Sequence, residues 1–168
     1  MLPDLTVDLK DPERSTGLLD DWAWLLGPEK RPLLLTASGD AFVLDVRDET
    51  VHFLNVSAGK VFQIAQTREA FKTLLDDTAF VEEYLCPYFI EHLRARGMVL
   101  KRNEIYSYRL PLSLGGEVSA DNIDMVDAEV HFSIAGQIAR QIADLPEGTP
   151  IAKLDLKIPK KRSWWKFW

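Results

Sequence analysis

The stretch from Ala41 to Ala65 constrains the fold more than any other part of the chain, because strand-like patterns there are separated by short turns. Apolar side chains alternate through 41–46, 51–56 and 60–65, and turns are expected at 48–50 and 57–59. This pattern is typical of antiparallel strands joined as a meander, with one buried face and one wet face. We therefore expect an antiparallel sheet in the middle of the chain.

Apolar residues four apart predict the main helices. One stripe predicts a helix over 79–96 that Pro87 kinks or splits, and another predicts a helix over 128–143 capped by Asp127. Thr67 is expected to cap a helix over 68–75, and Thr78 the helix that follows it. A short helix over 17–26 and strands over 98–100 and 105–110 complete the pattern. The expected class is α+β, an antiparallel sheet covered mainly on one face by the helices at 79–96 and 128–143.

The expected core draws on both kinds of element, since the apolar faces of strands and helices must be buried together. Its members are Trp22, Phe42, Leu44, Val51, Phe53, Phe71, Leu85, Phe89, Ile134 and Ile138.

Composition indicates one soluble domain. The chain has 168 residues, of which 46% are hydrophobic and 27% are charged. We expect a single α+β domain over 1–150 and a separate tail over 151–168. Cys86 is the one cysteine, so no intramolecular disulfide can form and a reducing compartment is indicated. With no signal-like start and no apolar run of about 20 residues, we expect a cytoplasmic protein.

Charge is unevenly divided between these two parts. The net charge is −6, but residues 151–168 carry six basic residues against one acid, so the tail is +5 and the body −11. An acidic body argues against direct binding of nucleic acid. It suits a basic protein partner instead.

Catalytic and metal motifs are missing from the sequence. The histidines His52, His92 and His131 have no metal-ligand spacing, and no nucleophile has a local base. We expect no catalytic residue, no cofactor, no metal and no enzymatic activity. The alternative is a small enzyme with a deep cleft lined by His131, Glu117 and Tyr106.

Two segments are stronger candidates for function. The first is a glycine-containing loop after the strand at 105–110, which we interpret as a partner-contact loop; its residues are Leu114, Gly115, Gly116 and Glu117. The second is the tail, where basic and aromatic residues stand side by side. Its candidate anchor residues are Lys160, Lys161, Arg162, Trp164, Trp165 and Trp168. Such a tail suits a membrane surface or an acidic protein groove, could fold back on the acidic body, or could be a free terminus.

The order of several motifs is similar to a known family. The motifs are Gly39–Asp45, Val51–Leu54, Ile64–Phe71, the strand Glu104–Tyr106, the loop Leu112–Glu117, and Asn122-Ile123 leading to Val130–Gln137. Over about residues 20–145 this resembles the C-terminal domain of type VI secretion DNase-immunity proteins, many of which carry a preceding GAD-like domain. Here that preceding part is at most about 20 residues long, and the tail matches no family pattern.

The resemblance implies an antitoxin-like immunity protein that binds a cognate toxin and blocks it. It brings no catalytic residues, and it does not say whether the toxin is a DNase. Two alternatives to this binding role stay open from the residues alone: a small enzyme, and a membrane-peripheral adaptor that acts through the basic aromatic tail.

Overall fold

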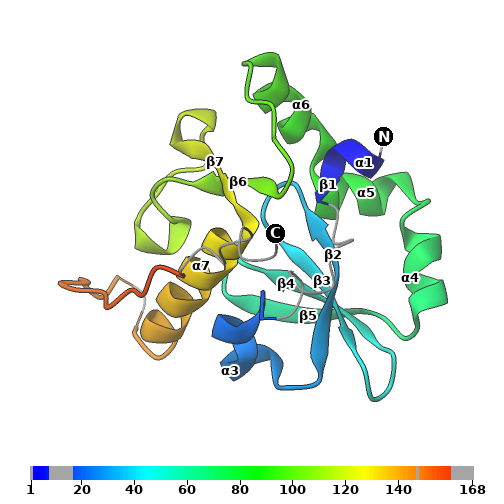
Figure 1. Ribbon diagram of the computed structural model, residues 1–168, viewed down its shortest axis with the longest axis horizontal. Helices are drawn as coiled ribbons and strands as arrows, with labels where there is room; N and C mark the ends of the chain where they lie inside the picture. The colour runs from blue at the N-terminus through cyan, green and yellow to red at the C-terminus, as the bar shows by residue number, and fades with distance from the viewer. Residues whose placement is uncertain (1, 8–16, 147, 160–168) are drawn as a thin grey trace, which may run out of the picture.

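The computed structural model describes residues 2–7, 17–146 and 148–159, and its centre is a five-stranded antiparallel meander (Figure 1). Each strand pairs with its neighbours in sequence, in the order β1-β2-β3-β4-β5. The strands are β1 (Thr6–Val7), β2 (Lys30–Thr36), β3 (Ala41–Asp45), β4 (Val51–Asn55) and β5 (Lys60–Ala65). The short β1 follows the one-turn helix α1 (Leu2–Leu5) and forms one edge of the sheet.

The register of the central strands gives the sheet two apolar faces. Phe42 pairs with Phe53 and Leu44 with Val51, so these side chains share one face. Val43, between them, belongs to the opposite face, and every residue of β3 is buried. The meander is confirmed, but neither face of its central strand is wet. The alternating pattern in the sequence predicted one wet face, and it could not show that both faces of the sheet are covered.

One face is covered by three helices that follow the sheet. They are α4 (Arg68–Leu74), α5 (Thr78–Leu85) and α6 (Pro87–Ala95). Phe42 is the centre of an aromatic group there, with ring centroids 5.0 Å from Phe53 and 4.7 Å from Phe71. Cys86 takes the left-handed conformation, φ 48°, between α5 and α6. The predicted split before Pro87 is therefore confirmed.

The opposite face is covered by the last helix and an early pair of short helices. These are α7 (Ala128–Ile142), η1 (Asp20–Trp22) and α3 (Ala23–Leu26). Trp22 is fully buried, and its indole N–H donates to the carbonyl of Phe132 at 2.9 Å. Figure 1 shows α7 and α3 on one side of the sheet and α4 and α5 on the other. The α+β class is confirmed. The segments predicted as helices over 79–96 and 128–143, however, cover opposite faces of the sheet instead of the same face.

Gly136 explains why α7 packs on η1. A Cβ at this position would lie 2.8 Å from the Asp21 carbonyl oxygen, so a glycine lets the two backbones touch. The buried side of α7 is accordingly Ala128, Phe132, Gly136 and Ile138. Of the expected core, Phe89 and Ile134 are only partly buried, and the other eight residues are buried.

A second, two-stranded sheet follows α6 and leads into α7. β6 (Glu104–Tyr108) pairs antiparallel with β7 (Ile123–Asp127), and α7 follows β7 directly. The N–H of Tyr106 donates to the carbonyl of Ala37 at 2.8 Å, which ties β6 to the end of β2. The connection between the strands contains η2 (Leu112–Leu114) and η3 (Ala120–Asn122).

Several local predictions need correction. Residues 98–100 form no strand, and residues 17–26 contain η1 and α3 in place of one helix. The cap of α5 is Asp77, whose carboxylate accepts from the Ala79 N–H at 2.8 Å, so Thr78 is the first helical residue. Both predicted caps at Thr67 and Asp127 are confirmed by their side-chain hydrogen bonds.

Candidate partner-binding surface

The connection between β6 and β7 is a loop closed on itself by one asparagine. The Asn122 side-chain oxygen accepts from the Leu110 N–H, and its amide nitrogen donates to the carbonyls of Leu110 and Glu117, each at 2.9 Å. The Arg109 N–H also donates to the Asn122 carbonyl at 2.7 Å. We call residues 109–122 the clamped loop. Its two ends and its far side are thereby held together.

The two glycines of the clamped loop are required by its shape. Gly115 has φ 90°, a left-handed conformation that favours glycine. A Cβ on Gly116 would lie 1.9 Å from the Leu110 carbonyl oxygen, so no other residue fits without opening the loop. The glycine pair therefore lets residues 115–116 pack closely against Leu110 at the start of the loop.

The clamped loop offers an apolar surface with an acidic neighbour. Val118 is 74% exposed and Leu110 is 47% exposed, both large values for aliphatic side chains. Of the predicted contact residues, Gly115 and Glu117 are exposed, while Leu114 and Gly116 are partly buried. The structure brings these four together on one loop and adds Leu110 and Val118. Sequence reasoning missed those two because an exposed aliphatic residue cannot be told from a buried one in an irregular segment.

Ion pairs connect the clamped loop to its surroundings. The guanidinium of Arg96, just after α6, bonds the Asp121 carboxylate at 2.5 Å and lowers the pKa of that carboxyl group. Arg109 lies 3.7 Å from Asp124 of β7. Exposed pairs of this kind add little stability. Their effect here is on position, since they hold the loop between α6 and β7.

The partly buried His131 connects three elements through hydrogen bonds. Its Nε2 lies 2.8 Å from the Gly39 carbonyl and its Nδ1 lies 2.9 Å from the Ser107 hydroxyl. Because a carbonyl only accepts, Nε2 carries the proton and the Ser107 hydroxyl donates to Nδ1. Burial lowers the pKa of His131 to about 4. Both ring nitrogens are thus used to join the β2–β3 turn, β6 and α7.

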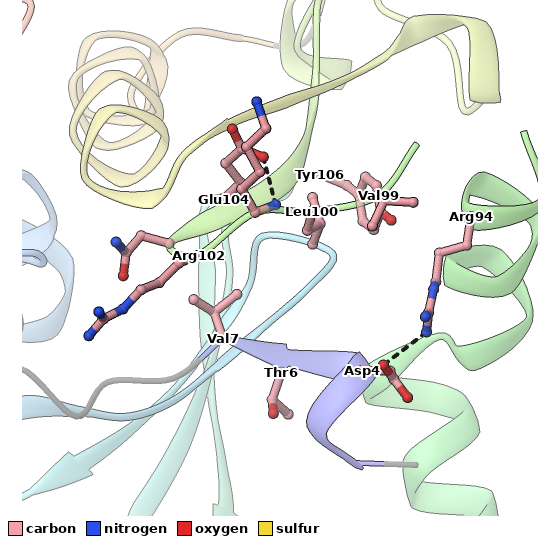
Figure 2. Close-up of a pocket in the computed structure, with 11 residues that line it drawn as sticks. Asp4, Thr6, Val7, Arg94, Val99, Leu100, Arg102, Glu104 and Tyr106 are labelled. Atoms are coloured by element: carbon pink, nitrogen blue, oxygen red, sulfur yellow. Dashed lines mark hydrogen bonds and ion pairs between the residues drawn. The ribbon is translucent and has the colours of Figure 1, made fainter. Parts of the chain in front are cut away.

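A shallow pocket of about 320 Å³ lies between β1 and the segment that leads into β6 (Figure 2). Arg94 and Asp4 form an ion pair at 3.0 Å on its wall. Tyr106 lines this pocket, but His131 and Glu117 do not. The Tyr106 hydroxyl is also engaged, as a donor to the Met98 carbonyl at 2.7 Å. The three residues of the enzyme alternative therefore do not share this pocket.

Other candidate features give no site within the described part of the chain. No three His, Cys, Asp or Glu side chains in residues 2–7, 17–146 and 148–159 are grouped to hold a metal ion. Burial raises the pKa of the Cys86 thiol, which disfavours its nucleophilic form. None of the described helices is long and apolar enough to cross a membrane. The candidate anchor residues of the tail, Lys160 to Trp168, lie outside the described residues.

One part of the chain is similar to a known family. Residues 65–139 match the family described as T6SS immunity protein Tdi1, C-terminal. The resemblance to type VI secretion immunity proteins is thereby confirmed. The matched residues run from the end of β5 into α7 and contain the whole clamped loop. The matched region is therefore the one that carries the candidate surface.

Comparison with solved structures supports the fold. A crystal structure of Atu4351 from Agrobacterium tumefaciens is similar to this chain, with a TM-score of 0.53 and 21% sequence identity. The similarity covers 75% of this chain and 64% of that one, so the chain spans less than two thirds of its length. At this identity the likeness concerns the fold alone. No curated protein matches the chain.

Proposed function

We propose that this chain is an immunity protein that neutralises a cognate toxin by binding it, with the clamped loop as the centre of contact. The observation that carries the proposal is the family match over 65–139, which includes the whole loop. The loop has the features of a binding element: exposed Leu110 and Val118, and a conformation held by Asn122. A preformed loop loses little conformational entropy on binding.

The proposed toxin surface is basic. The chain carries a net charge of −6, and Glu117 and Asp124 are exposed at and beside the clamped loop. Opposite charge on the partner speeds encounter and favours the correct partner over others. We place the interaction in the cytoplasm, where the single cysteine Cys86 stays reduced. Block by binding needs no catalytic residue, which fits the engaged nitrogens of His131.

A competition experiment tests the immunity role. A strain that lacks the gene for this chain is grown against its parent strain, which still carries the secretion system and the toxin. We expect the parent to kill the deletion strain, and wild-type chain supplied in trans to restore survival. Equal survival of the deletion strain would contradict the immunity role.

Two valine variants test the clamped loop in the same assay. Val118→Arg puts a cation at the proposed contact, and Val46→Arg makes the same change on an exposed valine beside the β3–β4 turn. We expect Val46→Arg to protect fully and Val118→Arg to lose protection, with toxin binding at least about tenfold weaker. Full protection by Val118→Arg in sensitive cells would leave the immunity role standing and remove the loop from the contact.

A further inference from the structure

Asp155 and Lys157 are hydrogen-bonded to two glutamines of α7. Figure 1 shows the later part of the segment 151–159 returning to the side of that helix. The Gln137 side chain accepts from the Lys157 N–H at 2.7 Å and donates to the Lys157 carbonyl at 2.9 Å. Gln141 does the same with Asp155, at 2.9 and 3.0 Å. Each side-chain amide thus bonds both backbone groups of one residue, as a neighbouring β-strand would.

The spacing of the two glutamines suits an extended chain. Four residues of an α-helix rise about 6 Å, and two residues of a strand rise about 6.6 Å. Gln137 and Gln141 can therefore hold alternate residues of one strand-like segment. Both amides are also held in place: Gln137 donates to Ser133 at 3.0 Å, and Gln141 donates to the Gln137 carbonyl at 3.1 Å. We call residues 154–158, held in this way, the strap.

The outer edge of the strap is open. In an extended chain, consecutive residues direct their N–H and C=O groups to opposite sides. Since Asp155 and Lys157 bond α7, the backbone groups of the residues between and beside them point away from it. No hydrogen bond to Leu154, Leu156 or Ile158 is present among the described residues. Ile158 is 77% and Leu156 38% exposed, so the edge is apolar as well as unpaired.

The sequence of the strap is complementary to itself about Leu156. If two straps run antiparallel with Leu156 opposite Leu156, then Asp155 of each faces Lys157 of the other. Leu154 then faces Ile158. In this register the Leu156–Leu156 and Leu154–Ile158 pairs are the hydrogen-bonded ones. These are the same residues whose backbone N–H and C=O groups point away from α7. Charge, apolar pairing and hydrogen-bond phase therefore agree on one register.

We propose that the outer edge of the strap is a self-association site, where two copies of the chain pair antiparallel about Leu156. The contact has two-fold symmetry, so each copy contributes the same surface. A two-stranded ribbon alone is marginally stable in water. Here each strand is backed by the glutamines of its own α7, which removes much of the cost of ordering it. The proposal does not rest on the proposed immunity function.

A charge exchange in the full-length chain tests the proposal. Asp155→Lys sets lysine against lysine at both symmetry-related contacts, and Lys157→Asp sets acid against acid. The double variant Asp155→Lys/Lys157→Asp restores opposite charges in the same register. None of these changes removes a bond to α7, because Gln137 and Gln141 bond only backbone atoms.

Sedimentation velocity over a range of concentrations gives the outcome. We expect a reversible dimer of the wild-type chain, about tenfold weaker association for each single variant, and recovery in the double variant. A chain that stays monomeric at hundreds of micromolar would overturn the proposal. So would a dimer that all three variants leave unchanged, since another surface would then hold it.

A cysteine placed on the symmetry axis tests the register itself. In a Cys86→Ser chain, Leu156→Cys puts two thiols opposite each other at a Cα separation of about 5.5 Å, which a disulfide can span. Ala152→Cys is the matched control, because residue 152 does not face itself in this register. We expect rapid oxidation to a covalent dimer for Leu156→Cys alone. Equal cross-linking of both cysteines would overturn the register.

Discussion

Two partly buried titratable residues lie near the β2–β3 turn and have opposite effects on stability. Asp40 accepts from the Val56 N–H at 2.8 Å, and burial raises the pKa of its carboxyl group to about 7. His131, held by the adjacent Gly39, has its pKa lowered by burial to about 4. The folded state therefore favours a proton on Asp40 and disfavours one on His131. Both residues hold the β2–β3 turn, which places Gly39 against α7.

The pH dependence of stability separates these two residues. Asp40 contributes stability below its unfolded pKa near 3.8, and this is lost as pH rises toward 7. His131 contributes stability above its unfolded pKa near 6.5, and this is lost as pH falls toward 4. Between pH 4 and 6.5 the two slopes oppose each other, each at most about 1.4 kcal/mol per pH unit. The wild-type chain should therefore show little net slope from this pair.

Urea unfolding of Asp40→Asn and His131→Gln across this range checks the assignment. Relative to wild type, we expect Asp40→Asn to gain stability as pH rises, because the cost of ionising Asp40 is gone. His131→Gln should lose relative stability over the same range. Difference curves of the same sign for the two variants would show that one residue is assigned wrongly. Asp45 does not interfere, because Arg47 lowers the pKa of its carboxyl and its effect falls at lower pH.

At the scale of elements, the contact between α7 and η1 decides which face the last helix covers. A helix interior normally favours alanine over glycine by about 1 kcal/mol. At position 136, however, a Cβ would meet the Asp21 backbone at 2.8 Å. The two effects have opposite signs, and overpacking against a backbone costs about 1–3 kcal/mol. We expect the cost of the clash to exceed the gain in helix propensity.

We therefore expect Gly136→Ala to lower the free energy of unfolding by about 1–2 kcal/mol. Chemical unfolding followed by Trp fluorescence is a suitable measurement, because Trp22 lies in this contact and bonds Phe132. A stabilisation near the helix-propensity value would mean that η1 moves away freely, and that its contact with α7 does not set the position of the helix.

Features that depend on residues close together in the sequence were predictable. Features that depend on contacts between distant residues were not. The caps at Thr67 and Asp127 and the break at Pro87 depend on residues a few positions apart, so the sequence shows them. The face chosen by α7 depends on Gly136 meeting Asp21, which no local pattern reveals. The glycine loop was recognisable, but its closure by Asn122 and the exposure of Val118 were not. Pairing of residues 155–157 with glutamine side chains has no sequence signature.

At the scale of the whole molecule, the five-stranded sheet and the region matched to the family lie in different parts of the chain. The meander supplies a sheet with apolar side chains on both faces, and helices from the later part of the chain cover each face. The family match begins only at residue 65, so it includes just the last residue of the five-stranded sheet. The clamped loop connects β6 to β7, and although its Ala120 packs against the core, its Leu110 and Val118 are exposed, where a partner can reach them.

The acidic character of the molecule predicts how a toxin would approach it. Glu117→Gln with Asp124→Asn removes two charges at and beside the clamped loop, and Glu69→Gln with Asp76→Asn removes two exposed charges at α4 and just after it. Charge steering acts mainly on the association rate and is screened by salt. The loop pair should therefore slow association with the toxin severalfold at low salt and flatten its salt dependence. The α4 pair should have a smaller effect.

Surface plasmon resonance at two ionic strengths measures both pairs, once the killing assay has identified the toxin. Equal slowing by both pairs would mean that total charge steers the encounter and not the charge near the loop. Unchanged rates in all variants would remove electrostatics from recognition. The apolar side chains Val118 and Leu110 would then carry the contact alone, since they are the large exposed aliphatic residues on the clamped loop.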